Sequence, residues 1–271
     1  MGRCLQEQVN VGSTPTPTSK LFTMKQTFTI NTEKNRIEFH DARFYLSDNG
    51  MYIPSVTTIL DAFPKGPEYY AWLKKYGEDA DTIRDEAGKR GSIVHDLTEK
   101  YDEGEEINFL NDYGHPKYKM LEWAMFERYV EFSDAHKPKV DMIEIHMIDE
   151  RLGFAGTIDR VINLNGKSML MDIKTSSAVH QSYWLQLAAY FELLKCNSVF
   201  VDQVGILWLN AKTRTIGKGD AIQGKGWQLL VKDVKEVARD YALFQSTYAL
   251  WKELNEDVKP RNLSYTLTYK K

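Results

Sequence analysis

Gly153-Phe-Ala-Gly-Thr-Ile-Asp159 and Ser168-Met-Leu-Met-Asp172-Ile-Lys174-Thr175 are predicted to form the two strands of a hairpin. Asn165-Gly166 between them is typical of a two-residue turn, because both positions tolerate the positive φ of a type I′ turn. With this turn as the centre, residue 164 faces 167, 162 faces 169, and Asp159 faces Asp172. Like charges that face each other at about 5 Å are destabilising. Lys174 shares the sheet face of Asp172, so two carboxylates and an ammonium are predicted to meet at one point.

Opposed carboxylates indicate a hard divalent cation such as Mg²⁺ or Mn²⁺. These ions prefer oxygen ligands and are held by one or two protein carboxylates together with substrate phosphate. Such a cation polarises a phosphoryl oxygen and activates water, and a nearby lysine can offset the charge that develops in the transition state. The alternative is that Asp172 and Lys174 form an ordinary exposed ion pair worth less than about 1 kcal/mol.

Composition places further limits on the class of protein. The 271 residues, 42% of them hydrophobic, are enough for one large domain or two small ones. The net charge of -3 gives no global basic signature, although a local patch can still bind phosphates. Two cysteines, Cys4 and Cys196, can form neither a disulfide framework nor a four-thiolate zinc or iron–sulfur site, which favours an intracellular protein. No apolar run approaches the ~18 residues of a membrane span.

Hydrophobic periodicity predicts an α+β (mixed α/β) fold in a single domain over residues 26–271. Residues 1–25 are polar and rich in Pro and Thr, so we expect a disordered tail. Besides the hairpin we expect strands over 28–30, 37–39, 44–46, 140–148, 199–209 and 214–216. Helices are predicted over 56–63 with Ser55 as N-cap, and over 67–76, 78–102, 118–135, 182–195 and 231–254.

Four short motifs in order give the sequence a family resemblance. Gly91-Ser-Ile-Val-His95, Gly156-Thr-Ile-Asp159, Asp172-Ile-Lys174-Thr175 and Gln186-Leu-Ala-Ala-Tyr190 together resemble the RecB-type branch of the PD-(D/E)xK nuclease superfamily. Pro54-Ser-Val-Thr-Thr-Ile-Leu60 resembles the mitochondrial genome maintenance exonucleases and related phage exonucleases. The resemblance covers about residues 52–195, with the core motifs in 88–195. It implies a restriction-endonuclease-like core, a central mixed sheet flanked by helices, with an N-terminal strand and helix extension.

The resemblance also implies roles for individual residues. It makes Lys174 the catalytic lysine and Gln186 a supporting residue, with Glu144 at an acidic position whose role varies in the family. The metal ligands that it implies are His95, Asp159, Asp172 and the carbonyl of Ile173. The DNA contacts that we expect are Lys89, Arg90, Thr175 and Tyr190. Because the chain lacks the necessary cysteines, the branches that carry an iron–sulfur cluster are disfavoured.

The residues themselves leave alternatives open at several of these positions. Gly91 and His95 share a helix face, where a glycine allows another backbone to approach, but a lone helical histidine is more often a surface or core residue. Tyr190 has the spacing of a core residue as much as that of a functional one. Tyr69, Tyr70 and Trp72 are candidates for stacking on single-stranded bases.

These observations predict a Mg²⁺- or Mn²⁺-dependent DNA exonuclease that acts on single-stranded ends or flaps in replication, recombination or repair. The resemblance favours a bacterial or phage-infected cytoplasm and replication or recombination proteins as partners; a mitochondrial targeting segment is the weaker alternative, because the tail has few arginines. Two other functions stay open. One is a non-catalytic DNA- or partner-binding module on the same fold, and the other is a structure-specific endonuclease.

Overall fold

The computed structural model describes residues 23–25, 36–39, 42–214, 222–255 and 264–266. Six helices are seen there: α1 (Val56–Leu60), α2 (Pro67–Tyr76), α3 (Asp79–Asp102), α4 (Met120–His136), α5 (Gln181–Cys196) and α6 (Val234–Leu254). The strands are β1 (Thr23–Lys25), β2 (Arg36–Phe39), β3 (Ala42–Leu46), β4 (Tyr52–Pro54), β5 (Lys139–Asp149), β6 (Phe154–Leu164), β7 (Lys167–Lys174), β8 (Gln203–Arg214), β9 (Ile222–Asp233) and β10 (Ser264–Thr266).

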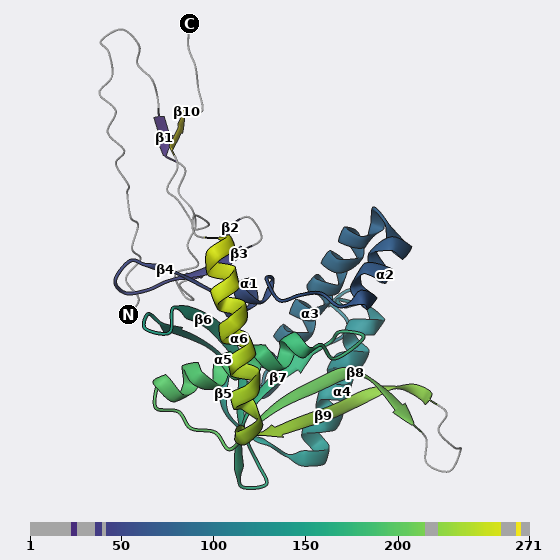
Figure 1. The fold of residues 1–271 in the computed structure, drawn as a ribbon. Helices are drawn as coiled ribbons and strands as arrows, with labels where there is room; N and C mark the ends of the chain where they lie inside the picture. The colour runs from purple at the N-terminus through teal and green to yellow at the C-terminus, as the bar shows by residue number, and fades with distance from the viewer. Residues whose placement is uncertain (1–22, 26–35, 40–41, 215–221, 256–263, 267–271) are drawn as a thin grey trace, which may run out of the picture.

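The centre of the molecule is a five-stranded mixed sheet with the strand order β5-β6-β7-β8-β9 (Figure 1). Its neighbouring strands are antiparallel except β7 and β8, which are parallel and joined by the crossover helix α5. Helices cover both faces, which confirms the predicted α+β class with a central mixed sheet flanked by helices. Two smaller sheets accompany it, β2-β3-β4 and β1-β10.

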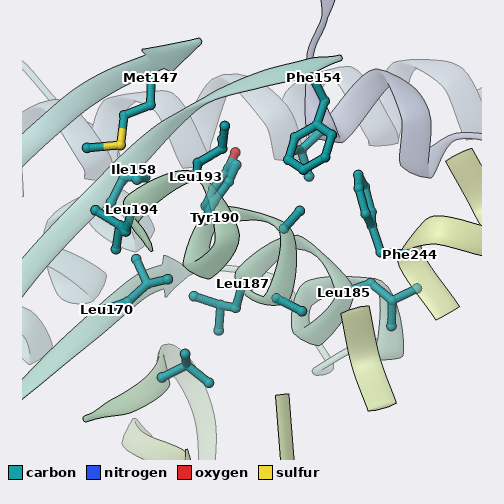
Figure 2. Close-up of a cluster of buried hydrophobic side chains, with 14 of the residues drawn as sticks. Met147, Phe154, Ile158, Leu170, Leu185, Leu187, Tyr190, Leu193, Leu194 and Phe244 are labelled. Atoms are coloured by element: carbon teal, nitrogen blue, oxygen red, sulfur yellow. The ribbon is translucent and has the colours of Figure 1, made fainter. Parts of the chain in front are cut away.

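The two faces of the central sheet carry separate cores. On one face, helices α1, α5 and α6 pack against sheet residues that include Ile158 and Leu170, and Figure 2 shows these two side chains among those of α5. On the other face, α3 and α4 contribute Val94 and Phe132 to a second core with Met171. Strands β6, β7 and β8 are therefore buried on both sides, so a polar residue in them needs a partner or a purpose.

The predicted hairpin register is confirmed as far as the ladder continues. Asn165 and Gly166 form the turn with φ of 53° and 81°, and Leu164 pairs with Lys167 and Ile162 with Met169. The ladder ends at Arg160 and Met171, one step before Asp159 and Asp172. The two strands separate at that step, which we had expected to be a regular pair.

Local sequence signals account for most of the other elements. The Ser55 hydroxyl caps α1 by accepting a hydrogen bond from the Thr58 amide at 3.0 Å, as predicted. Helix α2 has the predicted bounds, with Pro67 at its first position. The predicted strand 28–30 and residues 1–22 of the predicted tail lie outside the described residues, and Thr23–Lys25 at the end of that stretch form β1, which pairs with β10.

The segment before α6 corrects the sequence prediction. Residues 222–233 form β9, where we expected no strand, and α6 begins at Val234 rather than at 231. Strand β8 extends to Arg214, the first residue of the separate strand predicted over 214–216, and the rest of that prediction lies outside the described residues. The physical reason is the cap at Asp233, which forms a reciprocal capping box with Glu236 and fixes the start of the helix.

Candidate active site

The site begins where β6 and β7 separate. Continuation of the hairpin register would pair Ile173 with Ile158, but both backbone polar groups of Ile173 have other partners. Its amide donates to Asp159 Oδ2 at 2.8 Å, and its carbonyl oxygen lies 3.0 Å from His95 Nε2. The Asp159 carboxylate thus takes the place of a ladder acceptor, and the His95 side chain of α3 contacts both Ile173 and Asp159 at this step.

His95, Glu144 and Asp159 form the one group among the described residues whose ligand atoms lie close enough to share an ion. These atoms are all within 4.8 Å of one another. His95 Nδ1 is 3.5 Å from Asp159 Oδ2 and 3.7 Å from Glu144 Oε1. Ligands of an octahedral ion at about 2.1 Å are separated by roughly 3.0 Å in cis and 4.2 Å in trans, so the three side chains fit a shared Mg²⁺ or Mn²⁺.

The contacts of His95 support the same use, in the neutral form that a metal ligand must have. A carbonyl oxygen can only accept, so the 3.0 Å contact with Ile173 places a hydrogen on Nε2 and leaves Nδ1 facing the two carboxylates. Histidines that ligate metals generally donate their other ring N–H to a carboxylate, a carbonyl or water. The resemblance implied that the Ile173 carbonyl is itself a ligand; in the structure it contacts the imidazole.

Glu144 reaches this group through an unusual backbone. It has a φ of 46° in the middle of β5, a left-handed conformation that is uncommon for a non-glycine residue. We expected Ile143, Ile145 and Met147 to share one face of β5, but Ile145 and Met147 pack against the first core together with Met142. The regular alternation of faces is therefore interrupted at Glu144.

A second set of contacts surrounds Lys174. Its Nζ lies 2.7 Å from Asp172 Oδ2, 3.1 Å from Gln186 Oε1 and 4.8 Å from the centre of the Tyr183 ring. Gln186 Nε2 also donates to Asp172 Oδ1 at 3.2 Å. Both carboxylate oxygens of Asp172 are thus held by Lys174 and Gln186. The predicted ligand Asp172 belongs to the Lys174 group in this structure, whereas Glu144 belongs to the ligand group.

Negative charge dominates the electrostatics of the site. Burial raises the pKa of the Asp172 carboxyl to about 6, and the charge of Asp159 adds to this effect while Lys174 opposes it. Burial disfavours protonated His95, but the charges of Asp159 and Glu144 outweigh it and raise the pKa of the imidazole to about 9. Burial also disfavours the charged form of Lys174. The negative charges of Asp172 and Asp159 outweigh this effect and raise the pKa of the ammonium. The site favours positive charge.

Tyr190 supports the site from the core. It is 3% exposed, and its hydroxyl accepts a hydrogen bond from Gln186 Nε2 at 3.2 Å. Its ring packs directly on Gly156, where a Cβ atom would overlap the ring carbon Cε1. Figure 2 shows Tyr190 among the buried side chains of the first core. This burial favours support of Gln186 over the direct DNA contact that we expected.

The other predicted DNA contacts lie along α3 and at the end of β7. Lys89 is exposed and Arg90 half-buried, about one and a half turns before His95. A Cβ at Gly91 would meet Thr175 Oγ1 at 3.4 Å, an ordinary contact, so α3 and Thr175 face each other without the close backbone approach that we expected. Helix α2 buries none of its residues and exposes Tyr69 and Tyr70.

Two residues of the site were not anticipated, Arg160 and Tyr183. Arg160 follows Asp159 directly and precedes Val161 and Ile162, and this second charge in a strand with apolar neighbours is the signal that could have identified it. Tyr183 precedes Gln186 by three residues, so helical spacing places it on the same face of α5.

Comparisons with known proteins bear on this arrangement. Residues 69–262 match the family model described as the PD-(D/E)XK nuclease superfamily. The sequence gives no match among curated proteins. Among solved structures, one titled as LHK-Exo in complex with dAMP is similar with 13% identity, a TM-score of 0.31 and coverage of 74% of this chain and 91% of that one. A structure of SSO0001 has 16% identity, a TM-score of 0.25 and coverage of 51% of this chain and 68% of that one.

None of the described helices combines the length and apolar character that a membrane crossing requires.

Proposed function

The chain belongs to the PD-(D/E)XK nuclease superfamily, and we propose that it is a Mg²⁺- or Mn²⁺-dependent exonuclease that degrades DNA from single-stranded ends or flaps. One observation carries the proposal. The ligand atoms of His95, Glu144 and Asp159 converge within 4.8 Å of one another, and the charge of Lys174 acts on the same group. A set of metal ligands alone would also be compatible with a non-catalytic binding module. A charged lysine beside the ligands favours hydrolysis, because it can offset the charge of the transition state.

We propose the following roles for the residues of the site. His95, Glu144 and Asp159 would hold the cation. A divalent ion held there would polarise a phosphoryl oxygen and make water a nucleophile at neutral pH. Lys174 would orient the attacking water and offset the negative charge that develops on the phosphate. Asp172 and Gln186 hold the ammonium in place, and both are nearly inaccessible to solvent, with 1% and 8% exposure.

Single-stranded DNA is the substrate that the exposed surface supports best. Helix α2 presents Tyr69, Tyr70 and Tyr76 to solvent, with the exposed Lys74 and Lys75 on the same helix. Exposed aromatics interleaved with lysines are the combination that stacks unpaired bases and neutralises their phosphates. Processing of single-stranded ends is a task of replication, recombination and repair, and we propose an intracellular role of this kind, with DNA as the partner.

The test compares two substrates of identical sequence, a linear and a covalently closed circular single-stranded DNA. Purified protein is incubated with each in Mg²⁺, in Mn²⁺ or in chelator, beside the Asp159→Asn variant. We expect degradation of the linear strand alone, none in chelator and none by the variant. Degradation of circles would identify an endonuclease. Retained DNA binding without cleavage in either metal would identify the binding module.

A further inference from the structure

Arg160 is a charged side chain with no exposed surface, and it is the largest of the fully buried side chains among the described residues. It points from β6 toward α3 and α4. An unpaired buried charge costs several kcal/mol or more, so a guanidinium persists in such a place only when its donors are satisfied. The contacts of Arg160 show which groups satisfy them.

One end of the guanidinium is anchored to the helices. Arg160 Nε donates to Asp102 Oδ2 at 2.6 Å, and the Tyr129 hydroxyl donates to the same oxygen at 2.5 Å. Asp102 is the last residue of α3, and its side chain is 4% exposed. The anchor therefore fixes α3 and α4 against β6 and also provides the buried positive charge with a buried negative one.

The other end contacts two members of the ligand group directly, Asp159 and Glu144, and reaches the third, His95, through Thr98. Nη1 donates to the Asp159 carbonyl at 2.7 Å and lies 3.5 Å from Glu144 Oε1. Nη2 donates to Thr98 Oγ1 at 3.3 Å, and the Thr98 hydroxyl in turn donates to the His95 carbonyl at 2.9 Å. A single planar fork thus joins α3, β5 and β6 at the residues that carry the three ligands.

We propose that Arg160 is a positioning residue that holds His95, Glu144 and Asp159 at the spacing of a divalent cation before the cation binds. The inference rests on the proposed function, because it concerns the same metal site. Glu144 and Asp159 repel each other, and the positive charge 3.5 Å from Glu144 Oε1 offsets this repulsion. Lysine cannot substitute, because one ammonium does not span the four partners of a fork.

The experiment measures Mn²⁺ binding without DNA, by the electron paramagnetic resonance signal of free Mn²⁺. Loss of Arg160 alone would leave Asp102 buried and unpaired, so the main variant is Arg160→Met combined with Asp102→Asn, which removes both charges and keeps an acceptor for Tyr129. We expect a 10- to 100-fold weaker affinity, about the effect of losing a residue that orients metal ligands.

A matched control removes another largely buried ion pair. Lys232 and Asp240 lie 2.5 Å apart between β9 and α6, and neither contacts the ligand group. Lys232→Met with Asp240→Asn should leave Mn²⁺ affinity within about twofold of the parent protein. The Arg160→Lys variant retains the charge and should bind Mn²⁺ as weakly as the main variant, which keeps the test decisive if the latter fails to fold.

The outcomes separate the two levels of the proposal. If the folded main variant or Arg160→Lys binds Mn²⁺ as tightly as the parent protein, the positioning role alone is overturned. Parent protein that binds no Mn²⁺ would overturn the proposed function and this inference with it. Equal weakening in the Lys232 control would also overturn the inference, because the effect would then be one of general destabilisation.

Discussion

Replacement of Gly156 by alanine should destabilise the folded protein through one collision. The added Cβ would overlap Tyr190 Cε1 and lie 3.0 Å from Cζ and 3.1 Å from the hydroxyl oxygen. The ring cannot retreat easily, because Tyr190 is 3% exposed and hydrogen-bonded to Gln186. Overpacking of a core costs about 1–3 kcal/mol, and an enclosed ring places this case in the upper part of the range.

Alanine also lowers the entropy of the unfolded chain, which returns about 0.4–1 kcal/mol where the backbone tolerates it. Gly156 does not have a positive φ, so this gain applies. The net loss of unfolding free energy is therefore about 1–2 kcal/mol, and each kcal/mol lowers the melting temperature of a chain of this size by about 2–4 °C. Urea unfolding followed by tryptophan fluorescence measures it, and the m-value should not change.

A second substitution tests the cause. Tyr190→Leu removes the three atoms that the new Cβ would meet, so the double variant should lose less stability than the sum of the two single variants, by at least about 1 kcal/mol. Tyr190→Phe retains Cε1 and should not rescue. If the single costs add within about 0.5 kcal/mol, the usual limit for independent sites, or if Gly156→Ala matches the parent protein, the collision is not the constraint at this position.

Three other predictions concern the site and its surroundings. Lys174→Met should lower cleavage at least about 100-fold, the loss expected for one transition-state donor, while Mn²⁺ binding persists; cleavage at the parental rate would contradict the role of the ammonium. Mn²⁺ at 100 times its dissociation constant should add about 2.7 kcal/mol to the unfolding free energy, and Asp159→Asn should abolish the gain in calorimetry. Tyr70→Ala, at a side chain that is 55% exposed, should weaken the binding of a single-stranded oligonucleotide by about 1–3 kcal/mol in fluorescence anisotropy. Tyr113→Ala, at an 86% exposed position in the loop between α3 and α4, serves as the control and should have no effect.

The parts of the fold that the sequence predicts well depend on local signals. Asn165-Gly166 sets the hairpin register by its backbone preference alone, and Ser55 begins α1 by its hydroxyl. Strand β9 was missed because Gly224 and Gly226 and several polar residues interrupt its apolar pattern. The capping box at Asp233 and Glu236 was a usable signal, since it places the helix start after the strand.

The parts of the site that the sequence could not predict depend on tertiary contacts. Continuation of the hairpin suggested that Asp159 and Asp172 face each other, but the Ile173 amide binds the Asp159 carboxylate and the strands separate. The two acidic groups therefore serve different neighbours, His95 and Lys174. Strand periodicity cannot reveal the positive φ of Glu144 either, because a glutamate carries no sequence signal for a left-handed conformation.

The left-handed backbone conformation of Glu144 lowers stability but places its carboxylate at the candidate metal site. A non-glycine residue in the left-handed region costs about 1–3 kcal/mol, and such strain persists where it serves a function. Glycine at 144 would relieve this strain and remove the carboxylate that faces His95. Selection of variants for thermal resistance alone would therefore reward the loss of this side chain and, with it, the loss of the proposed metal site.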